Sequence, residues 1–232
     1  MIRFERGDNC LWLPPDVRPA AGPPPAIIFL HGIGERGSGG EELDRVRLWG
    51  LPKLRTGSAA APALTGFPFL VVAPQCPATA RWCDADVLAG LDALVAGMVA
   101  AGDADPQRLA VAGFSMGGIG TFCAALQAPR RFGALISVCG ACEVPQRLPE
   151  IAHLPMWIAW AEDDEIGYLT EGSRHVVEAM HGTGAVVARP YRLGALPDAG
   201  AHVRTADAAF AEPELYRWLS RVLIAGAGPE AA

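Results

Sequence analysis

A serine between two glycines is the part of this sequence whose residue types could most directly do chemistry. It lies in Gly113-Phe-Ser-Met-Gly117, after an apolar run and before a stretch of helical character. At a tight strand-to-helix turn, the glycines avoid clashes with neighbouring backbone and the turn exposes the hydroxyl of Ser115. The N–H of Met116 then lies at the positive end of the helix, where it can face a developing oxyanion. We predict Ser115 as a nucleophile; a plain tight turn is the alternative.

A serine hydroxyl is a weak nucleophile unless a histidine takes its proton and a carboxylate orients that histidine. Four histidines follow the serine in the chain: His153, His175, His181 and His202. The first precedes a predicted strand, and the next two fall within a predicted helix. His202 follows the last predicted strand in a loop rich in small residues, so we expect it to be the base. The alternative is a solvated loop histidine.

The carboxylate is expected after another strand, Met156 to Ala161, where the sequence reads Glu162-Asp-Asp-Glu165. Four adjacent carboxylates are typical of a solvated loop tip, but only one needs to turn inward. We predict Asp164, with Asp163 second and Asp198 third. Its role would be electrostatic, because a carboxylate that accepts the histidine Nδ1–H stabilises the imidazolium formed in the transition state.

A second oxyanion donor is expected in the loop that follows an earlier strand. The sequence Leu30-His-Gly-Ile-Gly34 ends the apolar run Ala26 to Leu30 and offers glycine backbone there. We predict the N–H of Ile33 as this donor. We expect His31 to shape the loop through hydrogen bonds rather than to act in catalysis.

Short apolar runs alternate with helical stretches and must position these residues. The runs are Ala26–Leu30, Phe69–Ala73, Leu109–Gly113, Ala134–Val138, Met156–Ala161 and Ala185–Ala188, and the helical stretches are Asp84–Ala101, Met116–Gln127, Gly167–His181 and Pro213–Ile224. Strands apolar on both sides belong to a parallel sheet covered by helices on both faces. This order predicts an α/β fold with ligands beyond the carboxyl ends of the strands.

Length and composition favour one domain over residues 1–232. Residues 1–25 would form an N-terminal strand segment with a proline-rich connection, and residues 225–232 a frayed tail. Apolar residues make up 51% and charged residues 19%, which excludes bulk disorder. The net charge of −6 and the lack of a basic run make nucleic acid a poor partner. We see no export signal and no stretch long enough to span a membrane, so we expect a cytoplasmic protein.

Six cysteines, Cys10, Cys76, Cys83, Cys123, Cys139 and Cys142, are expected to be buried thiols, because the cytosol keeps thiols reduced. The pair Cys139 and Cys142 has redox spacing, but it ends a strand-like run instead of beginning a helix. Thiol exchange is therefore a minor alternative. No set of four cysteines and histidines has zinc spacing, so we expect neither a metal nor a cofactor.

Together these residues resemble the α/β-hydrolase superfamily, and within it the small serine carboxylesterases with prolyl-oligopeptidase or dienelactone-hydrolase kinship. The segments that carry the resemblance are Phe29–Gly37, Trp49–Leu54, Val71–Pro77 with Arg81-Trp82, Gly113–Gly118 and Pro213–Leu219. The resemblance implies the α/β-hydrolase fold, with a mostly parallel central sheet and helices on both faces. It also implies the chain order serine, acid, histidine.

The resemblance also bears on individual residues. It places the acid four residues after a His-Gly-like strand end, here Trp160-Ala161, which favours Asp164; the departure from His-Gly keeps Asp163 open. Trp82 resembles an aromatic residue at the rim of the active site in related esterases, with a half-buried surface tryptophan as the alternative. Dienelactone hydrolases proper use cysteine where Ser115 stands. Related peptidases carry a large extra domain, for which this chain has no room.

The sequence therefore predicts a serine hydrolase that cleaves small-molecule carboxylic esters through an acyl-enzyme. Ser115, Asp164 and His202 would form the triad, with the N–H groups of Ile33 and Met116 as the oxyanion hole. Alternatives are a peptidase or amidase of prolyl-oligopeptidase type, and a non-catalytic binding protein on the same scaffold, since fold does not guarantee activity.

Overall fold

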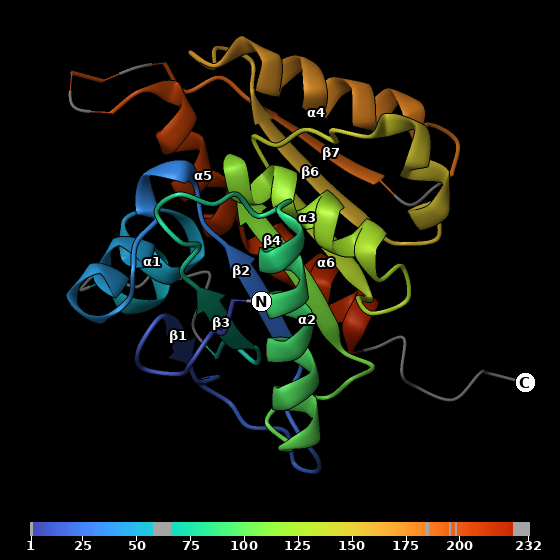
Figure 1. Ribbon diagram of the computed structural model, residues 1–232. Helices are drawn as coiled ribbons and strands as arrows, with labels where there is room; N and C mark the ends of the chain where they lie inside the picture. Colours follow the sequence, from blue (N-terminus) through green and yellow to red (C-terminus); the bar gives the residue numbers. More distant parts are fainter. Residues whose placement is uncertain (1, 58–65, 184–185, 195, 198, 225–232) are drawn as a thin grey trace, which may run out of the picture.

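A seven-stranded sheet forms the centre of the molecule (Figure 1). The computed structural model describes residues 2–57, 66–183, 186–194, 196–197 and 199–224. The strands lie in the order β1-β3-β2-β4-β5-β6-β7. Only the pairing of β1 with β3 is antiparallel. The strands are β1 (Cys10–Leu13), β2 (Ala26–Leu30), β3 (Leu70–Pro74), β4 (Leu109–Phe114), β5 (Ala134–Val138), β6 (Met156–Ala161) and β7 (Val186–Tyr191).

Helices cover both faces of this sheet (Figure 1). The α-helices are α1 (Gly50–Thr56), α2 (Ala85–Ala100), α3 (Met116–Gln127), α4 (Gly167–Ala179), α5 (Ala201–Ala211) and α6 (Pro213–Leu223). The 3₁₀ helices among the described residues are η1 (Ile33–Glu35), η2 (Gly40–Arg47) and η4 (Pro145–Ile151). One core contains residues of α2, α3 and α4, and the other contains residues of α1, α5 and α6. This is the fold that the alternation of strands and helices predicts.

The central strands are buried on both sides because their alternate side chains enter different cores. In β2, Ile28 and Leu30 belong to the core with α2 and α3, whereas Ile27 and Phe29 belong to the core with α1 and α5. Successive side chains of a strand point to opposite faces, so a continuous apolar run satisfies both cores at once. The β2 residues are at most 1% exposed. The carboxyl ends of these strands are thereby held together at one edge.

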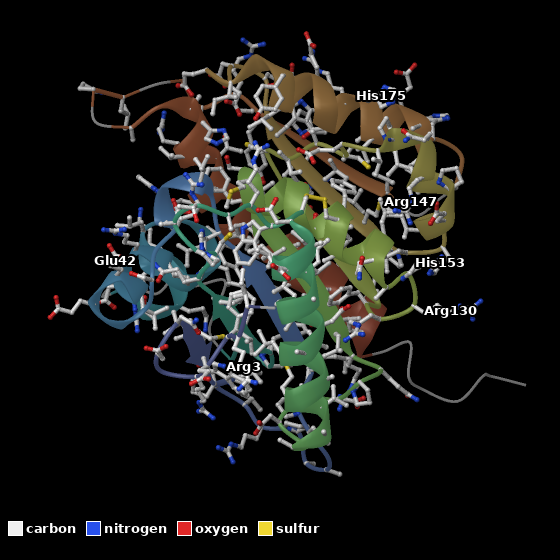
Figure 2. All side chains as sticks on the ribbon, viewed as in Figure 1. Arg3, Glu42, Arg130, Arg147, His153 and His175 are labelled. Carbon is white, nitrogen blue, oxygen red and sulfur yellow. A yellow bond between two sulfur atoms is a disulfide. The ribbon has the colours of Figure 1, made fainter. Side chains whose placement is uncertain are left out.

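Two expectations from the sequence are wrong. Cys83 and Cys123 form a disulfide, where we expected thiols (Figure 2). Cys83 precedes α2 and Cys123 lies on α3, and no spacing in the sequence indicates that these elements meet. The second concerns His202, which lies in the first turn of α5 and not in a loop. Cys10, Cys76, Cys139 and Cys142 are free, as expected.

Some expectations fall on residues that the structure does not describe. The expected tail, residues 225–232, lies outside the described residues, as does Asp198, the third candidate for the acid. Among the residues that are described, no helix is long and apolar enough to cross a membrane.

Candidate active site

Ser115 lies at the sharp turn between β4 and α3, as predicted. Its backbone has φ 56° and ψ −119°, a conformation in the left-handed region that a residue other than glycine rarely adopts. The turn is held by hydrogen bonds from the Ser115 N–H to the Val138 carbonyl at 2.9 Å and from the Ile119 N–H to the Ser115 carbonyl at 3.0 Å. Such strain at one residue persists only when the surroundings fix it, and it is common at functional sites.

The side chain of His202 lies directly against Ser115. The His202 Nε2 atom is 2.9 Å from the Ser115 Oγ, and the His202 Nδ1 atom is 2.7 Å from the Asp164 Oδ2. His202 also packs on the ring of Phe114, with ring centroids 4.7 Å apart. If Nδ1 carries the proton toward the carboxylate, Nε2 is free to accept a proton from the serine hydroxyl. The structure thus brings together the three predicted side chains.

The other downstream histidines do not reach this place. His153, His175 and His181 are all exposed. Figure 2 shows His153 and His175 on the outer surface, on the η4 and α4 side of the molecule. Of the four histidines that follow Ser115, only His202 is buried against it.

Asp164, not Asp163, faces the imidazole. Asp164 has a fully buried side chain, and its second oxygen, Oδ1, accepts the Ile166 N–H at 2.8 Å. The Oδ2 atom of Asp163 instead accepts the N–H of Gly194 at 2.7 Å, in the connection between β7 and α5. The adjacent carboxylates therefore point in different directions from the end of β6. Spacing alone left these two residues open as alternatives.

Glu165 fixes the position of His202, and the sequence analysis missed it. Its carboxylate accepts the Ala201 N–H at 2.6 Å and the His202 N–H at 3.0 Å, at the start of α5. Burial opposes the charged form of Glu165, yet these N–H groups help to hold its pKa below the usual value. The first N–H groups of a helix lack partners within it, and a carboxylate there is favourable. The partner comes from 36 residues earlier, which explains why the sequence did not predict the helix.

Cys139 also contacts the triad acid. Its sulfur lies within 4.8 Å of ligand atoms of both Asp164 and His202. Burial raises the pKa of Cys139 well above its usual value, and the negative charge of Asp164 adds to this effect. The thiol therefore keeps its proton and faces the carboxylate as a neutral group. Like Ser115, Cys139 has a positive φ, here 48°.

Each of the two predicted oxyanion donors is the first residue of a helix. Met116 is the first residue of α3 and Ile33 is the first residue of η1, so neither N–H has an acceptor within its own helix. The preceding N–H, that of Gly32, is already donated to the Glu35 Oε2 at 2.5 Å. The loop after β2 therefore leaves Ile33, and not Gly32, to provide a backbone donor.

His31 shapes this loop and is not part of the triad contacts. Its Nε2 accepts the Cys76 N–H at 2.9 Å, so its Nδ1 carries the hydrogen that is donated to the Gly32 carbonyl at 2.6 Å. Burial lowers the pKa of His31 to about 4, and the ring is neutral at ordinary pH. The Trp82 indole N–H donates to the His31 carbonyl at 2.8 Å. Trp82 is 0% exposed, which excludes a half-buried surface tryptophan, and its place at the rim of the site stays a prediction.

Glu35 is a second residue that the sequence analysis missed. It is 4% exposed, and burial raises the pKa of Glu35 to about 7 although the Gly32 N–H and the charge of His202 oppose the rise. A glutamate three residues after a helix N-cap is a known capping pattern, and that spacing was the available signal. Glu35 places a titratable carboxyl beside the predicted oxyanion loop.

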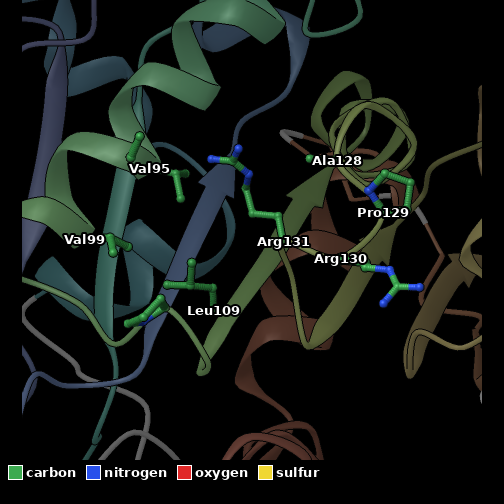
Figure 3. A pocket seen from close by; sticks show the side chains of 9 residues that line it. Val95, Val99, Leu109, Ala128, Pro129, Arg130 and Arg131 are labelled. Carbon is green, nitrogen blue, oxygen red and sulfur yellow. The ribbon is translucent and has the colours of Figure 1, made fainter.

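One large cavity of the described residues is lined by none of these side chains. It has a volume of about 620 Å³ and is lined by Val95, Val99, Leu109, Arg131 and neighbouring residues (Figure 3). Leu109 begins β4, so this cavity is at the amino end of the strand whose carboxyl end carries Ser115. A much smaller cavity, of about 10 Å³, is lined by Met116, Ile119, Trp82, Cys83 and two charged residues, Arg81 and Glu143. The larger cavity and the hydrogen-bonded side chains around Ser115 thus lie in different places. We place the candidate active site at Ser115 because the groups that can react are there.

Two groups of described side chains have the donor atoms of a metal site. One is Cys83, Cys123 and Glu143, but its two sulfurs are bonded to each other and offer no thiolate. The other is Cys139, Asp164 and His202, where the acid and the imidazole already bind each other. Thiol exchange needs a lowered thiol pKa. Burial raises the pKa of both Cys139 and Cys142, which disfavours the redox alternative.

Known proteins with a similar sequence or structure are hydrolases by their descriptions. The model of the prolyl oligopeptidase family matches residues 78–170, which include Ser115 and Asp164 and end before His202. A thermostable esterase of known structure is similar over 90% of this chain, with 27% identity and a TM-score of 0.72; the chain spans 58% of that protein. A Mycobacterium tuberculosis puromycin-hydrolyzing peptidase is similar over 99%, with 19% identity and a TM-score of 0.66, and the chain spans 40% of it.

Esterase PE8 is similar over 94% of this chain and 100% of its own, with 16% identity and a TM-score of 0.61. No curated protein matches the chain. The two structures below 25% identity show a shared architecture. With the thermostable esterase and the order of the strands, they show that the chain has the α/β-hydrolase fold, as predicted from the sequence.

Proposed function

We propose that this α/β-hydrolase cleaves carboxylic esters through a covalent acyl-serine intermediate. The observation that carries the proposal is the unbroken series of hydrogen bonds from the Ser115 hydroxyl through His202 to Asp164, with distances of 2.9 and 2.7 Å. A nucleophile, a base and an orienting acid within hydrogen-bond reach are what this chemistry requires. The order serine, acid, histidine along the chain is the one found in this superfamily.

The first half of the reaction transfers the acyl group to the enzyme. His202 Nε2 takes the hydroxyl proton as the Ser115 oxygen bonds to the ester carbonyl carbon, which gives a tetrahedral intermediate and an imidazolium. Asp164 stabilises that imidazolium through Nδ1–H. The imidazolium then gives its proton to the ester oxygen as the bond between carbon and that oxygen breaks. The alcohol leaves, and the acyl group remains on Ser115.

Water completes the cycle by the same route. His202 takes a proton from a water molecule whose oxygen attacks the acyl carbon, and the bond to Ser115 then breaks. The serine oxygen recovers its proton from the imidazolium, and the carboxylic acid leaves. In both halves the carbonyl oxygen becomes an oxyanion, which the N–H groups of Ile33 and Met116 would stabilise. One such donor is worth about 3–4 kcal/mol of barrier.

A labelling experiment tests the proposal. The purified chain is treated with a fluorophosphonate probe and, separately, assayed on short-chain nitrophenyl esters. We expect labelling and hydrolysis by the unaltered chain and neither by Ser115→Ala. Ser220→Ala, at a partly buried position on α6, is the matched control and should keep both activities. Circular dichroism shows whether each variant is folded.

Two outcomes would contradict the proposal. If Ser115→Ala keeps both labelling and turnover, the nucleophile lies elsewhere. If the unaltered chain is folded but is neither labelled nor active, the scaffold is that of a binding protein.

Amide or peptide cleavage is the second candidate, because the family model that matches residues 78–170 is that of prolyl oligopeptidases. The same triad serves both reactions, so geometry at Ser115 does not separate them. Esters and amides with the same acyl group, assayed side by side, do. We expect kcat/KM to favour the ester, and faster cleavage of the amide would make the chain a peptidase or amidase.

A further inference from the structure

Glu35 is a buried carboxyl beside the proposed site that the mechanism above does not use. It ends η1, the short helix that begins with Ile33. Its Oε2 accepts the Gly32 N–H at 2.5 Å and lies 3.9 Å from the Nδ1 of His31. Burying an isolated carboxylate costs free energy, so buried carboxylates are usually paired with other groups or have a functional role. The Gly32 N–H needs an acceptor here, and an uncharged amide oxygen could serve as well.

The carboxylate decides which backbone N–H the loop presents. Because Gly32 donates to Glu35, the next N–H along the chain is that of Ile33. The arrangement is tight, since a Cβ on Gly32 would lie 3.0 Å from the Glu35 Oε2 and 3.4 Å from the ring of Phe114. Phe114 in turn packs on the His202 ring. Glu35, Gly32, Phe114 and His202 therefore form one packed series that joins the loop to the base.

The charged groups around Glu35 leave His202 as its electrostatic partner. His31 is neutral, because its Nδ1–H and Nε2 are committed to backbone groups and its pKa is lowered by burial to about 4. Arg36 makes no ion pair with Glu35 in the described residues and donates to the carbonyls of Ile33 and Ala80. On the far side of His202 lie Asp164 and Glu165, which bind its ring and its N–H.

The interaction between Glu35 and His202 is reciprocal. A positive charge on His202 stabilises the ionised form of Glu35. By the same energy, an ionised Glu35 stabilises a positive charge on His202, and that charge exists only after His202 has taken the serine proton.

We propose that Glu35 is a positioning residue whose ionised carboxylate holds Gly32 so that Ile33 faces the oxyanion, and which stabilises the imidazolium of His202 in the transition state. The proposal rests on the proposed ester hydrolysis. Glu35 would then be a second acid that acts through other residues. In the described structure, Glu35 has no hydrogen bond to Ser115 or to the ring of His202.

The buried carboxyl of Glu35 makes the free energy of unfolding depend on pH, and the direction of that dependence follows from its raised pKa. The pKa of Glu35 rises from 4.5 to about 7 on folding, so the folded state holds a proton that the unfolded state has lost between these values. The folded chain therefore loses stability as the pH rises from about 4.5 through about 7. A glutamine keeps an acceptor for the Gly32 N–H and avoids this loss. The stability gain at high pH follows from burial alone, so the rate is what separates the roles: a residue that served only the fold would be replaced without loss of rate.

The test compares Glu35→Gln with Glu41→Gln, which alters an exposed acid on the neighbouring helix η2. We expect Glu35→Gln to lower kcat about ten-fold near pH 8 with little change in KM, because a charge interaction of this kind is worth about one order of magnitude in rate. Its melting temperature should exceed that of the unaltered chain near pH 8 and equal it near pH 4. Glu35→Ala, which also removes the acceptor, should lower kcat further. Glu41→Gln should change neither quantity.

The outcomes separate this proposal from the proposed function. An unaltered chain that is not labelled by fluorophosphonate overturns both. Labelling together with an unchanged kcat in Glu35→Gln overturns the role of Glu35 alone. A melting temperature that falls equally at both pH values shows a purely structural residue and also overturns it. Should the variants not fold, infrared titration of the unaltered chain must show a buried carboxyl that ionises near pH 7, and its absence contradicts the proposal.

Discussion

Gly117 lies so close to Leu30 that a Cβ on this glycine would stand 1.8 Å from the Leu30 carbonyl oxygen. Leu30 ends β2 and Gly117 is the second residue of α3, so the contact joins the predicted oxyanion loop to the helix that begins after Ser115. The proposed oxyanion donors, the N–H groups of Ile33 and Met116, belong to these two elements. The glycine here serves close approach of two backbones, since its φ is not positive.

Gly117→Ala is therefore expected to separate the two elements. Overpacking against backbone should lower the free energy of unfolding by about 3 kcal/mol and abolish ester hydrolysis. The matched control is Gly97→Ala within α2, where a Cβ would meet nothing within 4 Å. That variant should be more stable by about 0.5–1 kcal/mol, because alanine favours helix. Urea unfolding measures both, and an active, stable Gly117→Ala would contradict the contact.

The thiol of Cys139 is expected to orient Asp164. We expect the thiol to donate a hydrogen bond to this nearby carboxylate, worth about 1.5–3 kcal/mol, so kcat/KM of Cys139→Ala should fall about ten-fold or more. Cys139→Ser retains a donor and should recover most of the loss. Cys142→Ala, at a partly buried free cysteine three residues on, should leave the rate unchanged. If Cys139→Ser and Cys139→Ala lose activity equally, the hydrogen bond is not the cause.

The disulfide between Cys83 and Cys123 is expected to contribute to stability. It closes a loop of 40 residues, for which loop-closure entropy predicts about 4 kcal/mol. Cys83→Ser or Cys123→Ser should lower the free energy of unfolding by about that amount, and so should reduction of the unaltered chain. Cys10→Ser is unsuitable as a control because Cys10 is buried in the core, so Cys142→Ser serves instead. Equal unfolding curves before and after reduction would show that the bridge contributes nothing.

The small cavity beside Met116 predicts a preference for short acyl groups. Its volume of about 10 Å³ is near the least that can hold one water molecule, so a long acyl chain cannot enter without moving Trp82 or Ile119. In a series of nitrophenyl esters, kcat/KM should be highest for acetate and fall with chain length. Ile119→Ala should shift the preference toward longer chains, whereas Val99→Ala, at the distant large cavity, should not. Equal rates on acetate and octanoate would contradict this use of the cavity.

The sequence predicted what local pattern and chain order control. Continuous apolar runs such as Ala26–Leu30 and Ala134–Val138 match β2 and β5 in the structure residue for residue. The turn at Ser115 followed from two glycines between a strand and a helix. His202 was selected by its place after the last strand, and its distance to Ser115 is consistent with that selection.

What the sequence did not predict depends on contacts between remote segments. Glu165 satisfies the first N–H groups of α5, and without that partner the segment from Gly200 onward has no local signal for a helix start. The pairing of Cys83 with Cys123 requires the packing of α2 near α3. Asp163 and Asp164 are adjacent and of the same type, and they differ in their partners: Asp163 binds the Gly194 N–H and Asp164 binds His202 Nδ1. None of these relations has a spacing that is readable along the chain.

The position of β7 as the outermost strand has a consequence for how the protein fails on heating. Most β7 side chains are only partly buried, and the strand pairs only with β6 in the described sheet. The chain continues from β7 to α5, whose first turn carries His202. Margins of a sheet open at lower free energies than its centre. Warming should therefore detach the imidazole from the serine while the inner strands are still intact. Inactivation would then precede melting, and cooling would restore turnover.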